Sequence, residues 1–241
     1  AFVQIASQAQ QLMCSGAVEA ARAEGMALAR DELGRPLVVE IAEAPAAEEA
    51  RRLALRLQQA GANVIVGCTF FDASVALIDA LHEVDLSPAA LLLTSTVDQP
   101  AYESLVRGGW HRGEYALGLA SWHHTRPGRG AFSGLTSAEF ASAFASNYGG
   151  SAVSYQGAAS FAAACSLAAA IESAGTLSTP RVAAQLRAQR LVEFYATITY
   201  APNGQLAAPM AVLQYLPPAG AALVAPADVA AAPLAFPAPT W

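Results

Sequence analysis

Apolar residues in the first half of the chain alternate between short continuous runs and longer helical stripes. The runs are typical of buried strands and cover residues 2–6, 37–41, 63–67 and 89–93. After the second run, Leu53 and Leu57 fall at helical spacing, and Gly61 follows as a residue that ends a helix. Successive strand–helix units of this kind predict an α/β fold, a parallel sheet with helices on both faces.

The second half has a different rhythm. Residues 114–122 favour one more strand, after which three helices follow without strands between them. The first begins at a capping box of Thr136 and Glu139, the second covers residues 155–174, and the third begins at Thr179. Residues 194–200 and 210–216 flank a turn, which predicts a C-terminal antiparallel hairpin that closes the sheet.

Composition restricts the class of function. The chain of 241 residues has 54% hydrophobic and 13% charged residues, which favours a folded domain. Its net charge of −6 excludes nucleic acid as a partner, because phosphate contacts need clustered Lys and Arg. The longest apolar stretch, residues 157–171, is rich in alanine and interrupted by serines, so we predict no membrane-spanning helix. The chain begins directly with a strand, so any signal peptide is expected upstream.

No residue pattern indicates catalysis or a resident metal or cofactor. His123 and His124 are adjacent, so on extended chain their side chains point to opposite faces and suit a shared metal poorly. The glycines from Gly128 to Gly134 lack the spacing of a dinucleotide-binding loop. We therefore expect no enzymatic activity and no cofactor.

The three cysteines lack metal-site spacing. Cys14, Cys68 and Cys165 each lie among apolar neighbours, which favours buried, unpaired thiols. A disulfide between Cys14 and Cys68 is the alternative, since both follow strands of the same predicted sheet. Spacing alone cannot bring their Cα atoms within disulfide reach.

Several segments together resemble a known family. Residues 57–67 resemble a helix that enters a buried strand through a glycine turn, and residues 137–150 resemble a helix ending in Tyr-Gly. Residues 171–175 read Ile-Glu-Ser-Ala-Gly, and residues 194–205 end in Asn-Gly-Gln. In this order the segments resemble type 1 periplasmic binding proteins of the leucine/isoleucine/valine-binding type, over residues 1–216.

The resemblance implies two lobes, most of the first being absent from this sequence. Residues 1–120 with 192–216 would form the second lobe, and residues 121–191 would be a helical return segment of the incomplete first lobe. The Pro- and Ala-rich residues 217–241 are predicted to be a linker.

Ligands of parallel α/β sheets bind beyond the carboxyl ends of the strands. The polar and aromatic candidates at those ends are Ser7, Gln8, Thr69, Phe70, Asp72, Thr94, Thr96 and Asp98. The resemblance implies an aromatic residue after the third strand, which Phe70 matches, and an acid after the fourth. The acid position falls on Thr96, with Asp98 two residues on, and the aromatic expected after the first strand is replaced near Gln10.

Each candidate also has a structural interpretation. Asp72 is a good helix N-cap. Thr94 and Thr96 can bond the local backbone, and Phe70 can belong to the core. Tyr155 either lines the cleft or packs at the start of its helix.

We expect a domain that closes two lobes on a small polar, amino-acid-like ligand. It would lie on the extracytoplasmic side, either as the binding protein of a membrane transporter or as the outer domain of a receptor with a downstream membrane or signalling domain. The Pro-rich tail, as a tether, favours the receptor. The alternatives are a Rossmann-like enzyme fragment without its catalytic segment, and a non-binding interaction remnant.

Overall fold

The computed structural model describes residues 1–208 and 210–240, and the chain forms two compact units. Unit 1 comprises residues 1–119, 213–221 and 234–241, and unit 2 comprises residues 120–212 and 222–233. The chain leaves unit 1 after Leu119, and its C-terminal part then contributes to both units in turn. Each unit is described by itself.

The main sheet has seven strands in the order β2-β1-β3-β4-β5-β8-β9. Their bounds are β1 Phe2–Gln4, β2 Val38–Glu40, β3 Val64–Cys68, β4 Ala90–Leu93, β5 Leu117–Ala120, β8 Ala211–Leu216 and β9 Gly220–Ala225. The pairs β1–β2, β1–β3, β3–β4 and β4–β5 are parallel. The predicted parallel sheet is therefore confirmed.

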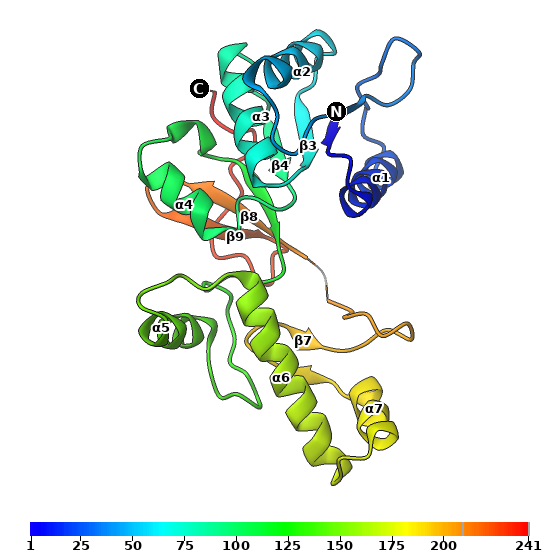
Figure 1. The fold of residues 1–241 in the computed structure, drawn as a ribbon, viewed down its shortest axis with the longest axis vertical. Coiled ribbons are helices and arrows are strands. Elements are labelled where there is room, and N and C mark those ends of the chain that lie inside the picture. The colour runs from blue at the N-terminus through cyan, green and yellow to red at the C-terminus, as the bar shows by residue number, and fades with distance from the viewer. Residues whose placement is uncertain (209, 241) are drawn as a thin grey trace. The chain divides into compact units, whose positions relative to one another are not determined.

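Helices flank the parallel strands of unit 1 on both faces (Figure 1). They are α1 Gln8–Ala23, α2 Ala47–Gln59, α3 Phe71–Glu83 and α4 Pro100–Arg107, followed by the 3-10 turn η1 His111–Gly113. Helix α1 lies on the face that carries Phe2 and Cys68, which pack against its Cys14 and Val18. Helices α2 and α3 lie on the other face (Figure 1). The short helix α4 was not predicted.

The sheet is closed by a C-terminal antiparallel hairpin, and its strand β8 matches the predicted residues 210–216, but the other strand is β9 and not the predicted residues 194–200. Strands β8 and β9 are neighbours in the sheet, and only residues 217–219 connect them, too few for a parallel crossover. Strand β8 joins the β5 side through Tyr115, whose N–H donates to the carbonyl of Tyr215 at 2.8 Å. Residues 194–200 are not its partner. An alternating pattern identifies a strand but does not choose its neighbour.

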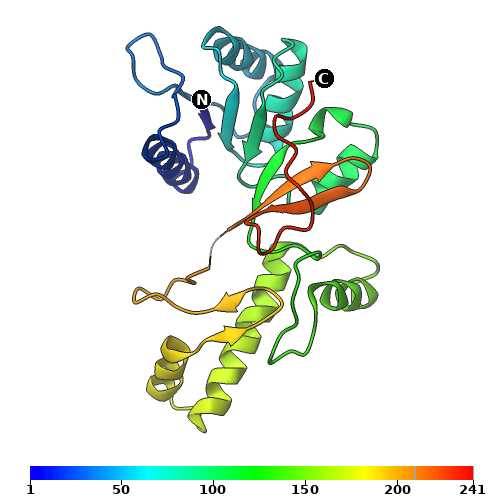
Figure 2. The ribbon, with the colours of Figure 1, turned by 180° about the vertical axis from the view of Figure 1, so that it is seen from behind.

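The predicted linker over residues 217–241 is also wrong for the described part of the tail. It contains β9, the second of the two orange to red strands in Figure 2. The buried side chain of Gln214 holds the tail farther on. The Gln214 amide accepts from the Ala235 N–H at 2.8 Å and donates to the Ala235 carbonyl at 3.0 Å. The Ala238 N–H donates to the Ala89 carbonyl at 2.8 Å. Backbone groups that bond to the sheet fix this tail in spite of its composition. Trp241 lies outside the described residues.

Unit 2 contains three helices and a small separate sheet. The helices are α5 Ser137–Asn147, α6 Tyr155–Ala174 and α7 Thr179–Ala188, and the antiparallel strands are β6 Leu191–Val192 and β7 Thr197–Ile198. The predicted capping box of Thr136 and Glu139 is present. Residues 192–212, which we assigned to the lobe of residues 1–120, belong to unit 2, because β7 pairs locally with β6.

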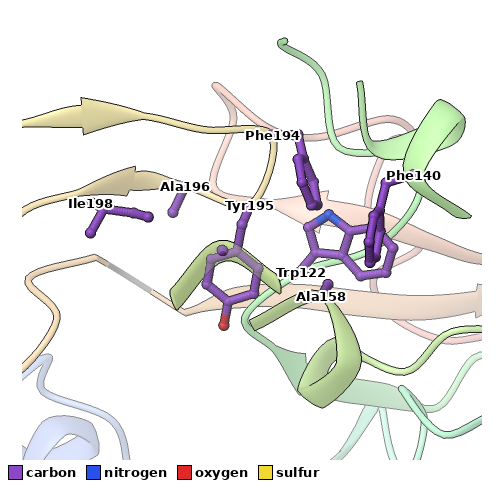
Figure 3. Packing of buried hydrophobic residues seen from close by; sticks show 8 residues of the cluster. Trp122, Phe140, Ala158, Phe194, Tyr195, Ala196 and Ile198 are labelled. Atoms are coloured by element: carbon purple, nitrogen blue, oxygen red, sulfur yellow. The ribbon is translucent and has the colours of Figure 1, made fainter. Parts of the chain in front are cut away.

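Aromatic side chains form the core of unit 2 (Figure 3). The rings of Phe140 and Phe194 stack at 4.8 Å, and Trp122 meets both edge-on at 6.0 and 6.2 Å. The Trp122 indole N–H donates to the Ser137 hydroxyl at 3.1 Å, and that hydroxyl donates to the Phe194 carbonyl at 3.1 Å. The indole is thus buried with its polar group satisfied.

The sequence analysis predicted no membrane-spanning helix, but α6 meets the criteria for one. Its 20 residues and mean hydropathy of 1.3 are sufficient, by length and composition alone, for a helix that crosses a membrane. Core helices of soluble proteins pass the same test, and Ala158 and Ala162 of α6 pack in the aromatic core of unit 2. One face of α6 therefore belongs to that core, whereas most of the helix is not buried, as at Phe161 and at Leu167, which is 46% exposed.

Truncating the central ring of this core should destabilise unit 2. We expect Phe194→Ala to lower the free energy of unfolding by about 3–5 kcal/mol, because it removes a fully buried ring and leaves a cavity. Urea denaturation followed by circular dichroism measures the change. Leu177→Ala, at a position that is 80% exposed, is the control and should change it by about 0.5 kcal/mol or less. Equal effects of the two substitutions would contradict the assignment of this core.

Candidate functional site

The order of the strands identifies one edge of the sheet as the place for a ligand. The chain passes from β1 outward to β2 and then returns to the other side of β1 as β3. At such a reversal the helices that follow leave on opposite faces, and ligands bind beyond the carboxyl ends of the strands there. Ser7 and Gln8 follow β1, and Thr69 and Phe70 follow β3. The sequence-predicted residues of unit 1 therefore lie at this edge.

Three buried hydroxyl groups hold the ends of β3 and β4 together. The Ser74 hydroxyl of α3 accepts from the Thr96 hydroxyl at 2.6 Å and hydrogen-bonds the Thr69 hydroxyl at 2.7 Å. All three side chains are fully buried. The three hydroxyl groups hydrogen-bond to one another. Thr69 and Thr96 therefore support the site and do not present donors to a ligand.

The sequence analysis missed Ser74, although a signal was present. Ser74 falls on the stripe of Leu77, Ile78 and Leu81 at helical spacing, which predicts that it is buried. A buried serine needs a hydrogen-bonding partner, and the threonines after β3 and β4 were already candidates. Combining the two observations would have found the network.

Gln10 connects α1 to the loop after β4. It is 1% exposed, and its amide oxygen accepts from the Thr94 hydroxyl at 3.0 Å. Its amide nitrogen donates to the Ser95 hydroxyl at 3.4 Å. Where the resemblance implies an aromatic residue, this chain thus has a polar side chain that binds two neighbouring loops together.

Four candidates at the same edge are accessible. Ser7 is half-buried, Gln8 is exposed, and Phe70 is 36% exposed, so Phe70 is not a core residue. Asp72 is exposed as well, but it is not the N-cap that the sequence suggested. Helix α3 begins at Phe71, with Phe70 as the N-cap residue, and Asp72 lies in the first turn. A carboxylate there is favoured by the helix dipole.

Asp98 has the most unusual environment of the candidates. It follows β4, and its Oδ1 atom is buried without a hydrogen-bonding partner among the described residues. Burial raises the pKa of Asp98 to about 6. Such an acceptor is costly unless something binds it. Among the candidates, Asp98 is therefore the one with an unsatisfied acceptor atom.

Tyr155 lies in unit 2, whereas the other eight candidates lie in unit 1. It is the first residue of α6 and packs, partly buried, against the aromatic core of unit 2. This position agrees with the structural interpretation of Tyr155. Its contribution to a ligand site remains a proposal.

Unit 1 is thus an α/β unit with a parallel sheet that is covered by helices on both faces and reverses at β1. Sequence comparison gives the family. The family model described as periplasmic binding protein matches residues 1–221, so the chain belongs to that family. No curated protein matches the chain in sequence.

Solved structures share the fold at low sequence identity. A branched-chain amino acid ABC transporter periplasmic ligand-binding protein from Burkholderia xenovorans has a TM-score of 0.74 at 16% identity, over 93% of this chain and 57% of that one. A leucine-binding protein from Thermotoga maritima has a TM-score of 0.65 at 18% identity, over 93% and 59%. An ABC-transporter solute-binding protein from R. palustris, in complex with benzoate, has a TM-score of 0.67 at 12% identity, over 98% and 60%. The chain thus spans less than two thirds of the length of these proteins.

The hydroxyl network should be important for stability. We expect Ser74→Ala to lower the free energy of unfolding by about 1–3 kcal/mol, because it leaves the hydroxyls of Thr69 and Thr96 buried without this partner. Thermal or urea denaturation tests this. The control is Ser104→Ala on the exposed face of α4, where alanine is the better helix former. If Ser74→Ala is as harmless as this control, the network does not hold the edge.

Proposed function

We propose that the carboxyl edge of the unit 1 sheet binds a small ligand that carries an ammonium group, such as an amino acid. Asp98 would be the anionic partner of the ammonium, and Phe70 would form part of an apolar wall. Ser7 and Gln8, after β1, would add polar contacts. Membership of the periplasmic binding protein family supports this class of function.

The buried Oδ1 of Asp98 is the observation that carries the proposal. A carboxylate oxygen out of contact with solvent and without a donor among the described side chains destabilises the ligand-free protein. A bound ammonium group supplies both the missing donor and the opposite charge. The hydroxyls of Thr69 and Thr96 are not alternative partners for the ammonium group, because they already bond to Ser74.

The position of the tail favours the transporter over the receptor. The receptor interpretation depended on a free Pro-rich tether, and residues 234–240 instead bond to unit 1 through Gln214 and Ala89. The solved proteins with this fold include ligand-binding proteins of ABC transporters. We propose that this chain is the ligand-binding part of such a protein, acts in the periplasm, performs no chemistry and delivers its ligand to a membrane transporter.

Removing the charge of Asp98 should stabilise the ligand-free protein at neutral pH. The raised pKa means that the folded state holds the proton more tightly than the unfolded state. The contribution of Asp98 to the free energy of unfolding is therefore greatest at low pH, and it falls as pH rises from about 4 to about 6. We expect Asp98→Asn to melt higher than the wild type at pH 7.5, and this advantage to vanish at pH 4.5.

The matched control for Asp98→Asn is Asp72→Asn at the same edge. Asp72 is exposed in the first turn of α3, so losing its charge should leave the melting temperature unchanged or slightly lower. A lower melting temperature of Asp98→Asn at pH 7.5 would argue against an uncompensated carboxylate.

Ligand binding can be tested with analogues that separate the two charged groups. Saturation-transfer NMR on the chain should detect leucine and 3-methylbutylamine, which carry an ammonium group, but not 4-methylpentanoate, which lacks it. We expect Asp98→Asn to weaken the first two at least tenfold, in the range measured for truncated charge pairs. Affinity should fall as pH drops below about 6, where Asp98 becomes neutral. Binding of 4-methylpentanoate as tight as that of leucine would instead indicate a carboxylate ligand and exclude the proposed role of Asp98.

A further inference from the structure

Two cysteines that lie 54 positions apart in the sequence meet inside unit 1. Cys14 of α1 and Cys68, the last residue of β3, are both buried in one small cluster with Phe2 and Val18. The Cys14 thiol donates to the Val3 carbonyl at 3.7 Å, which places it over β1. The parallel register sets Gln4 beside Cys68 on the neighbouring strand. The two buried side chains therefore lie close together in this cluster.

The orientation of the side chains agrees with this contact. Along a strand, alternate residues point to the same face. Phe2, Val66 and Cys68 thus share the face that α1 covers, and the buried stripe of α1 places Cys14 against it. The sequence left two alternatives open for this pair, and the fold brings the two side chains into one cluster, which sequence spacing alone could not show.

Both cysteines are buried, and Cys14 is the one that lies closer to the surface. Cys14 borders a surface hollow of about 390 Å³, whose lining includes Gln11, Ser15 and Arg22. Cys68 is not among the residues that line it. An external oxidant that enters this hollow would therefore meet Cys14 first, and Arg22, which lines the same hollow, would favour an anionic group there.

The proximity of the two thiols also distinguishes their reactivity. The neighbouring Cys68 thiol lowers the pKa of Cys14. The neighbouring Cys14 thiol and burial raise the pKa of Cys68 above its ordinary value. Cys14 is thus the thiol that ionises first and attacks, as thiol–disulfide exchange requires.

We propose that Cys14 and Cys68 form a disulfide when the chain meets a low-molecular-weight disulfide such as oxidised glutathione. The Cys14 thiolate attacks one glutathione sulfur and expels the other glutathione as a thiolate. The Cys68 sulfur then attacks Cys14, forms the Cys14–Cys68 bond and expels the second glutathione. Two protein thiols lose two electrons and two protons, and one oxidised glutathione becomes two reduced glutathiones.

The bond would reinforce the proposed ligand-binding edge. Cys68 directly precedes Thr69, and Cys14 is one helical turn beyond Gln10, which joins α1 to the loop after β4. A covalent link at this point fixes α1 against the end of β3. It would also close a loop between distant residues, which stabilises chiefly by restricting the unfolded chain. An oxidising compartment, such as the one in which we propose that the protein acts, is where such bonds persist.

Peptide mapping of the purified chain tests the proposal. The reduced protein is treated with oxidised glutathione, alkylated with N-ethylmaleimide in denaturant and weighed intact. We expect a single alkylated thiol, Cys165, and a non-reduced tryptic peptide that joins residues 1–22 to residues 57–107. A parallel sample refolded from urea in a glutathione redox buffer gives the pair access to oxidant during folding. Three alkylated thiols after both treatments, or a bond to Cys165, would overturn the proposal.

Single substitutions test the order of attack. Cys68→Ser should stop at a mixed disulfide and gain the mass of one glutathione on Cys14, whereas Cys14→Ser should gain none. Cys165→Ser in unit 2 is the control and should form the disulfide as the wild type does. The melting temperature of the oxidised wild type should exceed that of the reduced form by roughly 5 °C or more, and a reductant should abolish the difference. A disulfide that lowers the melting temperature would contradict its proposed role as a staple.

Discussion

The parallel pairing of β1 with β3 is the interaction on which the other features of unit 1 depend. Its register places Gln4 beside Cys68, and it sets the ends of the two strands at one edge of the sheet. Because β2 lies on the opposite side of β1, helix α1 leaves on one face while α2 and α3 cover the other. The hydroxyl network, the amide of Gln10 and the meeting of the two thiols all follow from that arrangement. A shift of one residue would turn Cys68 to the wrong face.

Local signals in the sequence predicted most elements of the first half. Continuous apolar runs marked β1 to β4, and glycines or caps marked the ends of several helices, as with the left-handed Gly61 after α2 and Gly175 after α6. Helix α4 was not predicted, because its eight residues are too few to show apolar positions at helical spacing. Short helices are specified by the surfaces they pack on, and a single sequence does not display those surfaces.

Pairing between distant segments was the weakest part of the prediction. The alternation over residues 194–200 was visible, yet β7 pairs with β6 a few residues upstream, and β8 pairs with β9 in a tail that composition marked as a linker. Proline and alanine content reports a tendency of the isolated chain. It does not report the hydrogen bonds that Gln214 offers to Ala235.

The candidate site could be located by the rule that ligands bind beyond parallel strands, but its members could not be ranked. Thr69 and Thr96 looked like ligand contacts and bond Ser74 instead. Asp72 and Asp98 looked alike in the sequence. The difference is burial: Asp72 is exposed, whereas Asp98 has an acceptor atom enclosed without a donor among the described residues. Only three-dimensional packing decides which of two carboxylates is left unsatisfied.

The hydrogen bonds by which Gln214 holds the C-terminal tail have a consequence for the folding of the chain during translation. Unit 1 needs residues 213–221 and 234–241, and unit 2 needs residues 222–233, so neither unit is complete until the last part of the chain exists. Domains usually fold as they are made, N-terminal first. Here the strands β1 to β5 must wait, partly assembled, until the segments after residue 212 have been synthesised. The interval between the two events is when this protein is most exposed to proteases and to association with other incomplete chains.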